Sequence, residues 1–444
     1  MQSGLGRRTA HLDESTTHEE LCDALRVLYP KPGTVTGGWL ICKSSGGWGS
    51  RKLSLVAPDD TGYTDWLSIS DPMRALSHCA NNFLRIHEDN SPLLLSMDIR
   101  SSPAEQDMAL ISFYKQSNVE WARPLNCRRE GDAAIGQGVT RFFFSASVEK
   151  LKSGFYINFA NSNITRLFEG ESGHLVPSAS HFLVESDMFI VAGRILGHSF
   201  LHGGPCMSGL SSAVVHVLLG GSPETATVTL EDCPDLDIRE TIRILEGESK
   251  LSDLDKIRVQ DLANAWDLPF LTENNRRWLY EKLLIHASKQ VIGRITRQIK
   301  QLRCGLKETP MWTVLTQRPD TVPLLFAKEG AGNLSSEVLL QRITWPCEDD
   351  DKDDDYSSDT KCSMSGYLRQ FITNAAPTEL TNLVKFWTGW EIIPASLSVE
   401  FVNGSYPTAS TCFETLRIPG MDNTSFKNDI LGCISTCQTG FGLV

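Results

Sequence analysis

The sequence contains no long hydrophobic run and no excess of basic charge. Its longest apolar candidate, residues 188–192, is ended by Gly193 and Arg194, far short of the roughly 20 residues that span a bilayer. The 444 residues carry a net charge of −12, which opposes attraction to nucleic acid and to anionic lipid. No apolar stretch follows Arg7 and Arg8 as it would in a signal peptide. We therefore expect an intracellular protein, cytoplasmic or nuclear, that binds neither nucleic acid nor a membrane.

Closely spaced cysteines are also absent. The twelve cysteines include no C-x-x-C pair, so neither a zinc ribbon nor a compact disulfide framework is indicated. We expect reduced thiols, no metal site and no cofactor.

The sequence is rich in residues that form cores. Hydrophobic residues make up 41%, with ten Trp and nineteen Phe, and a single core rarely extends beyond about 250–300 residues. We therefore expect at least two domains. Residues 1–90 are rich in Gly, Ser and Thr and form a poorly defined N-terminal region. In it the pattern predicts a short helix at 19–28 and two strands at 39–41 and 53–56.

From residue 91 onward, amphipathic helices alternate with short strands, which is typical of an α+β fold. One predicted helix covers residues 178–201, with an apolar face made of Phe182, Phe189, Ala192, Leu196 and Phe200. Gly193 and Gly197 would let another element approach that helix closely. A second predicted helix covers residues 273–302.

An acidic run at residues 348–355 holds seven carboxylates around Lys352, and such a run stays solvated. It is predicted to be a loop that ends one domain. Residues 364–444 read as a further compact unit. Its predicted elements are helices at 367–373, 378–386 and 425–434, a strand at 397–402 and a loop at 407–412.

Cys412 lies in that polar loop, where a partner could reach it. A thiol is nucleophilic enough to attack an activated thioester without a strong base. The alternative is a buried cysteine that packs as a small hydrophobe. A cysteine protease would need a histidine beside the thiol, and all ten histidines lie between His11 and His286. A relay between thioesters therefore fits this cysteine better than proteolysis does.

Three motifs around Cys412 resemble those of HECT ubiquitin ligases. Residues 406–419, Tyr-Pro-Thr-Ala-Ser-Thr-Cys-Phe-Glu-Thr-Leu-Arg-Ile-Pro, are similar to the active-site signature of the family. Residues 383–394 begin Leu-Val-Lys-Phe-Trp-Thr-Gly and resemble the pattern that opens its catalytic lobe. Phe441 stands where the family keeps a Phe needed for ubiquitin transfer. The wording Phe-Trp-Thr-Gly-Trp-Glu is shared with the G2/M-phase-specific branch of the family.

The large part of the chain resembles the same family. Residues 129–144 are similar to the opening region of HECT domains, and residues 175–177, 193–197 and 271–275 continue the match. The resemblance covers about residues 95–444.

This resemblance implies an α+β, bilobal HECT domain. A large, mostly helical lobe would cover residues 95–362 and a small α/β lobe residues 364–444, with a hinge near residues 361–366. Cys412 would accept ubiquitin from a conjugating enzyme as a thioester and pass it to a lysine of a protein substrate. Thr411 would help to position the thioester carbonyl, and Phe441 would anchor the tail.

Two departures from the family pattern support a second hypothesis. Ser410 stands where many members carry a His. Between Asp232 and Thr272, predicted charged helices at 237–246 and 251–262 replace the strands of the subdomain that docks the conjugating enzyme. The alternative is a catalytically degenerate HECT-like scaffold that binds ubiquitin or a substrate without transfer.

Overall fold

The structure is a computed structural model of the whole chain, and it describes residues 42–45, 52–55, 65–131, 136–157, 164–247, 249–329, 334–346 and 356–436. The chain divides into two compact units, Met1–Cys79 and Ala80–Val444. In the first unit, β1 (Cys42–Ser45) pairs antiparallel with β2 (Lys52–Leu55). The strand predicted at 53–56 overlaps β2, whereas the strand predicted at 39–41 lies outside the described residues, just before β1. The predicted helix at 19–28 lies outside the described residues.

Helix α3 (Pro72–Ile86) gives regular structure to part of the region 1–90, which the sequence pattern predicts to be poorly defined. Its buried side chains are Ala75, Leu76, Cys79 and Ala80, which is the spacing of one helical face. The Gly, Ser and Thr content of the preceding residues hid this short periodic stretch.

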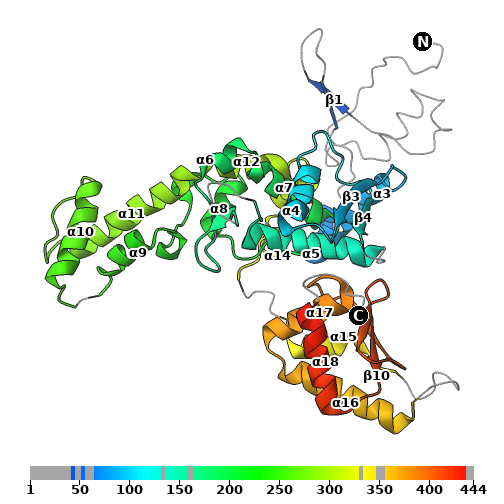
Figure 1. Cartoon of the computed structure of the whole chain (residues 1–444). Helices are drawn as coiled ribbons and strands as arrows, with labels where there is room; N and C mark the ends of the chain where they lie inside the picture. The colour runs from blue at the N-terminus through cyan, green and yellow to red at the C-terminus, as the bar shows by residue number, and fades with distance from the viewer. Residues whose placement is uncertain are drawn as a thin grey trace, which may run out of the picture. The chain divides into compact units, whose positions relative to one another are not determined.

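The large lobe is mainly helical and follows from residue 93 (Figure 1). Two strands, β3 (Leu93–Asp98) and β4 (Leu125–Glu130), pair in parallel, and β5 (Phe168–Glu169) pairs with β6 (Val176–Pro177). The helices are α4 (Pro103–Tyr114), α5 (Gln137–Ser153), α6 (His181–Glu185), α7 (Met188–Leu201), α8 (Ser212–Leu218), α9 (Leu236–Arg243), α10 (Asp253–Ala265), α11 (Arg276–Arg294), α12 (Thr296–Leu306), α13 (Met311–Gln317) and α14 (Val322–Leu325).

Both long helices predicted in this lobe are broken in two. Asp187, with φ of 58°, separates α6 from α7, and Ile295, with φ of −104°, separates α11 from α12. Asp is one of the few residues that enter the left-handed region readily. Phe182, predicted to share the apolar face of Phe189 and Phe200, lies on α6 and is 49% exposed, so that part of the prediction is wrong.

Helices α7 and α12 pack against each other through glycine, as predicted. A Cβ added at Gly193 would lie 2.9 Å from the Cα of Gly305, and one added at Gly197 would meet the side chain of Thr309 at 2.4 Å. Such a close approach of two helix backbones needs residues without side chains.

Helices α9, α10 and α11 form a helical subdomain with its own core. Its buried residues are Leu230, Ile242, Leu245, Val259, Ala263, Leu279, Leu283 and Ala287. Between Asp232 and Thr272, the residues that the structure describes form helices and no strand, which confirms the predicted departure from the family pattern.

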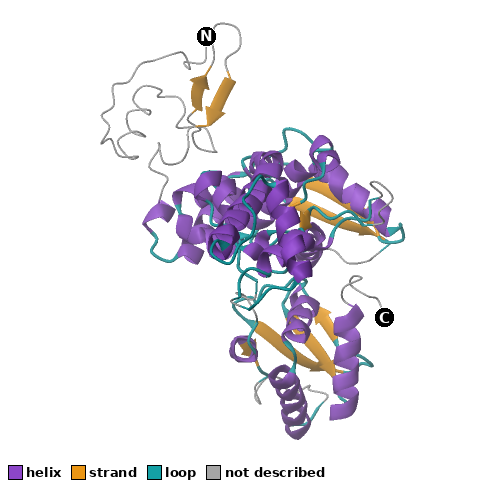
Figure 2. Cartoon of the chain, turned by 90° about the vertical axis from the view of Figure 1, so that its left-hand side faces the viewer, coloured by secondary structure: helices purple, strands orange, loops and turns teal. Residues whose placement is uncertain are grey.

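The small lobe packs helices on a four-stranded sheet (Figure 2). The strand order is β7-β8-β10-β9, with β7 (Ile343–Thr344), β8 (Leu397–Val402), β9 (Thr408–Ser410) and β10 (Thr415–Pro419). The helices are α15 (Ser336–Arg342), α16 (Ser358–Asn374), α17 (Pro377–Thr388) and α18 (Asn423–Thr436). The strand predicted at 397–402 is confirmed, whereas residues 408–410, predicted as loop, are a strand paired with β10.

Two features of this lobe bear on how the lobes are joined. Residues 361–366, predicted as the hinge, lie inside the continuous helix α16, so that location is wrong. Leu339 of α15 and Ile343 of β7 belong to the small-lobe core. The small lobe therefore begins no later than α15. The acidic run lies outside the described residues.

Candidate active site at the turn that carries Cys412

Cys412 lies in the tight turn 411–414 that joins β9 to β10. Residues 410 and 415 are paired across the two strands, and the backbone N–H of Phe413 donates to the carbonyl of Ser410 at 3.1 Å. Cys412 is exposed and Phe413 is 78% exposed, whereas Thr411 is buried. The alternative of a buried, packing Cys412 is therefore wrong.

The small lobe holds this turn through Trp387 of α17. The fully buried indole donates from Nε1 to the carbonyl of Glu414 at 2.8 Å. Glu414 has φ of 54°, a left-handed conformation that is unfavourable for most side chains. The hydrogen bond from Trp387 thus fixes a strained residue two positions after Cys412, and it links two of the motifs that the sequence singled out.

The large lobe reaches the same turn through Arg141 of α5. Its guanidinium forms an ion pair with the Glu414 carboxylate, with 2.9 Å between Nη2 and Oε1. Nη1 donates to the carbonyls of Thr411 at 3.2 Å and Thr388 at 3.4 Å. The guanidinium carbon also lies 5.1 Å from the centre of the Trp390 ring, within the range of a cation–π contact.

Glycines bring the two backbones together beside the thiol. Gly136, at the start of α5, has φ of 94°, and a Cβ added there would lie 3.3 Å from the sulfur of Cys412. A Cβ added at Gly389 would lie 2.9 Å from the carbonyl oxygen of Gly138. Side chains at these positions would separate the turn from the start of α5.

A second polar bridge joins α5 to the segment that follows α17. The Ser145 hydroxyl of α5 donates to Oε1 of Glu391 at 2.6 Å. The Lys385 ammonium lies 3.0 Å from the same oxygen. The contact between the lobes therefore has a glycine-lined part beside Cys412 and two polar parts, one at Arg141 and one at Glu391.

Two histidines of the large lobe, His198 and His202, pack among aromatic side chains away from the Cys412 turn. His198 and His202 pack with Phe113, Tyr114, Trp121 and Phe144, and the Tyr114 hydroxyl lies 3.0 Å from Nδ1 of His198. Burial lowers the pKa of His202 to about 4 and places the pKa of His198 well below its ordinary value. His198 is therefore a buried, neutral side chain, and His202 beside it is half-buried and neutral at neutral pH.

The sequence identified Cys412 and Thr411, which the structure places in one turn, and Phe441, which lies outside the described residues. Arg141 and Glu414 were not identified as site residues, although each stands within a stretch that resembles the family. Nothing in the sequence pairs them.

Comparison with known proteins identifies the family. The family model described as HECT-domain (ubiquitin-transferase) matches residues 152–444, more than half of the chain. The chain belongs to the HECT family. The predicted α+β, two-lobed fold is confirmed for this HECT chain, and the matched segment includes the Cys412 turn but begins after Arg141.

Curated relatives of this HECT chain carry the name G2/M phase-specific E3 ubiquitin-protein ligase. The protein from Gallus gallus is 26% identical over 275 residues, which cover 60% of this chain and 36% of that protein. The Homo sapiens protein is 23% identical over 262 residues, which cover 57% of this chain and 35% of that protein. The HECT chain thus spans about a third of the length of the curated relatives it matches.

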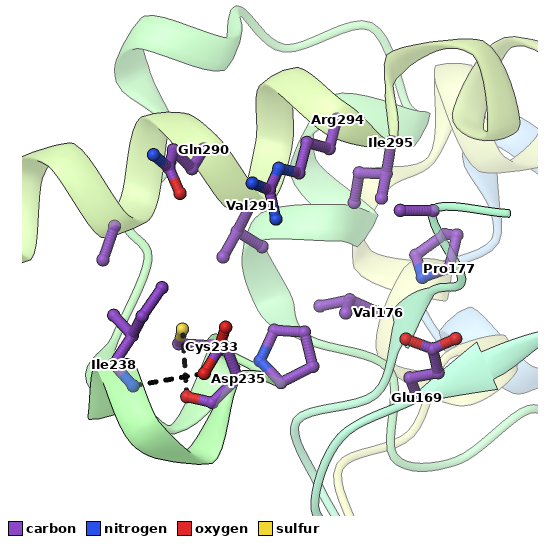
Figure 3. Close-up of a pocket in the computed structure, with 13 residues that line it drawn as sticks. Glu169, Val176, Pro177, Cys233, Asp235, Ile238, Gln290, Val291, Arg294 and Ile295 are labelled. Atoms are coloured by element: carbon purple, nitrogen blue, oxygen red, sulfur yellow. Dashed lines mark hydrogen bonds between the residues drawn. The ribbon is translucent and has the colours of Figure 1, made fainter. Parts of the chain in front are cut away.

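A cavity of about 260 Å³ lies between the helical subdomain and the rest of the large lobe (Figure 3). Gln290, Val291 and Arg294 of α11 face Ile238 of α9 across it, and none of its lining residues belongs to the turn 411–414. Within the described part of the chain, no three His, Cys, Asp or Glu side chains are grouped as metal ligands. No described helix is long and apolar enough to cross a bilayer.

Proposed function

We propose that this HECT chain is a ubiquitin ligase that carries ubiquitin as a thioester on Cys412 and transfers it to a lysine of a protein substrate. The observation that supports the proposal is an exposed cysteine in a tight turn that both lobes hold. The family of the chain and the names of its relatives point to the same reaction class.

The first step is an exchange of thioesters. The Cys412 thiolate attacks the carbonyl carbon of ubiquitin's C-terminal residue, which a conjugating enzyme holds as a thioester. A carbon–sulfur bond forms to Cys412 and the bond to the donor cysteine breaks, so the donor leaves as a thiolate. One thioester replaces another, and no oxidant or metal is needed.

The second step forms an amide. The neutral amine of a lysine attacks the thioester on Cys412, the carbon–nitrogen bond forms, and the carbon–sulfur bond breaks to leave a Cys412 thiolate. The nitrogen releases its extra proton to water. The buried Thr411 supports the turn from which the thioester carbonyl projects, and Phe441 anchors the tail. The two steps need different positions of the small lobe relative to the large lobe.

The decisive experiment is a loading assay. The full chain is incubated with the ubiquitin-activating enzyme, a panel of conjugating enzymes and labelled ubiquitin, and products are separated without reductant. Wild type should form an adduct that thiol cleaves, and Cys412→Ser should form an oxyester that resists thiol and is cleaved by base. Cys433→Ser is the matched control, because Cys433 is half-buried on α18 and burial raises the pKa of its thiol.

Two outcomes would overturn the proposal. A thiol-sensitive adduct on Cys412→Ala would place the thioester on another residue. Ubiquitin binding without any adduct, across all donors, would instead favour the catalytically degenerate scaffold.

A further inference from the structure

We propose that Arg141 is a positioning residue that docks the Cys412 turn onto the start of α5 for the second step, the transfer to an amine, and that the first step requires its release. The assignment of this docking to the transfer step rests on the proposed function. The docking itself stands on the geometry of the two lobes.

The Arg141 side chain is committed to the small lobe. Among the described residues, its polar partners are the carboxylate of Glu414 and the carbonyls of Thr411 and Thr388. A planar guanidinium donates in several fixed directions at once, so it can set orientation as well as distance. The Arg141 and Glu414 side chains are only 17% and 26% exposed, which limits the screening of their attraction by salt.

Arg141 contacts residues that stand before and after Cys412 in the sequence. Thr411 precedes the cysteine and Glu414 follows it by two residues, so Arg141 fixes both ends of the turn that carries the thiol. Gly136 places the start of α5 against the sulfur itself. The first-turn N–H groups of α5 have no side-chain cap from Gly136 and lie at the positive end of the helix dipole. A thioester carbonyl that gains negative charge during attack is favoured beside them.

The docked arrangement suits the second step better than the first. The family resemblance places the conjugating enzyme on the segment between Asp232 and Thr272, which here is the helical subdomain. That subdomain packs on the first half of α11, whose 19 residues span about 28 Å, and α9 and α10 lie at the end of α11 away from α7 and α12 (Figure 1). The turn is held instead by α5 and α17, so a donor on the subdomain meets Cys412 only after the turn leaves α5.

Disulfide trapping tests the docking without ubiquitin. In the full-length Gly136→Cys variant, the new thiol should pair with Cys412 under mild oxidation, because a Cβ at that position lies 3.3 Å from the Cys412 sulfur. Gly131→Cys is the matched control: Gly131 has φ of 92°, and a Cβ there meets Ile99 and Arg100 instead. The linked peptides are identified by mass spectrometry. Adding Arg141→Ala to Gly136→Cys should slow the cross-link at least tenfold.

Separate measurement of the two steps tests the assignment. Arg141→Ala should load ubiquitin at least as fast as wild type. Its discharge of ubiquitin to free lysine should be slower than that of wild type by about tenfold or more, since small misplacements of reacting groups have effects of this size. Arg141→Lys keeps the positive charge but loses the planar guanidinium with its several donors. This variant should therefore recover part of the discharge rate that Arg141→Ala loses. Arg194→Ala is the control: Arg194 is 12% exposed and binds Glu308 and the carbonyl of Tyr114 within the large lobe. It should leave the ratio of the two rates unchanged.

The two experiments test the docking role of Arg141 and its assignment to the second step separately. An unchanged cross-linking rate in Arg141→Ala would overturn the docking role. Equal losses of loading and discharge would overturn the assignment to the second step. If wild type forms no ubiquitin adduct, the proposed function and the step assignment both fail, whereas the trapping experiment still decides whether Arg141 docks the turn.

Discussion

Arg141 and Glu414, one on each lobe, form an ion pair with 2.9 Å between Nη2 and Oε1. Glu414 is also the residue of the Cys412 turn that adopts a left-handed conformation, with φ of 54°. One side chain therefore combines a local cost in backbone strain with a favourable contact across the lobes. A substitution at this position can separate the two effects.

Glu414→Asn should relieve strain while it weakens docking. Asn enters the left-handed region more readily than Glu, so the free energy of unfolding should stay unchanged or rise by up to about 1 kcal/mol. The neutral amide pairs poorly with a guanidinium, so cross-linking between Gly136→Cys and Cys412 should slow. Urea unfolding and the cross-linking rate are the measurements. Lower stability together with unaltered cross-linking would contradict both expectations.

Phe441→Ala is expected to act after loading. A residue that anchors the tail organises attack by the amine more than receipt from the donor, so the thioester should form while the ubiquitinated product is lost. Loading gels and single-turnover discharge on the same preparation measure both steps. Equal losses in a folded variant would indicate a general packing role for this side chain.

Gly193→Ala should destabilise the large lobe. The added methyl would lie 2.2 Å from the carbonyl oxygen of Leu302, so α7 and α12 must move apart, at a cost of about 1–3 kcal/mol or more. Gly293→Ala in α11 is the matched control, since its Cβ would meet nothing within 4 Å. That change should stabilise the protein by about 0.5–1 kcal/mol, because alanine favours a helix over glycine. Thermal unfolding of both variants shows whether the signs differ.

Acid should destabilise the large lobe through His202. Burial lowers its pKa from 6.5 to about 4 in the folded protein, so between these values the unfolded chain binds a proton that the folded protein does not. Stability is therefore retained above about pH 6.5 and falls as the pH drops toward 4, by up to about 1.4 kcal/mol per pH unit. His198 adds a change of the same sign.

The matched variants for this pH dependence are His202→Phe and His181→Gln. The His202 ring stacks on Phe144 with an interplanar angle of 24°, so Phe can occupy a similar space without titrating. Urea unfolding at pH 7.5, 6 and 5 should show a shallower decline for His202→Phe than for wild type. His181 is exposed, and its replacement should leave the decline unchanged. Parallel slopes in all three proteins would exclude His202 as the cause.

Local sequence was sufficient wherever the signal is contained in neighbouring residues. The strand at 397–402 was predicted with its observed bounds because Leu397 and Val399 alternate with the polar Ser398 and Glu400 in the sequence. The turn residues Thr411 and Cys412 were found because the signature around them is continuous in the chain. The helices between Asp232 and Thr272, where the described residues form no strand, followed from a run of charged, helix-favouring residues.

Tertiary structure decided what depends on residues far apart in the chain. The apolar spacing in the sequence continues across the breaks at Asp187 and Ile295, so periodicity alone could not reveal them. The hinge was misplaced because α15 joins the small-lobe core through Leu339, a packing contact with no local signature. The docking of Cys412 arises in the same way. Arg141 and Gly136 gain their roles only when α5 meets the turn, since an ion pair and a close backbone approach depend on distance in space and not on order in the sequence.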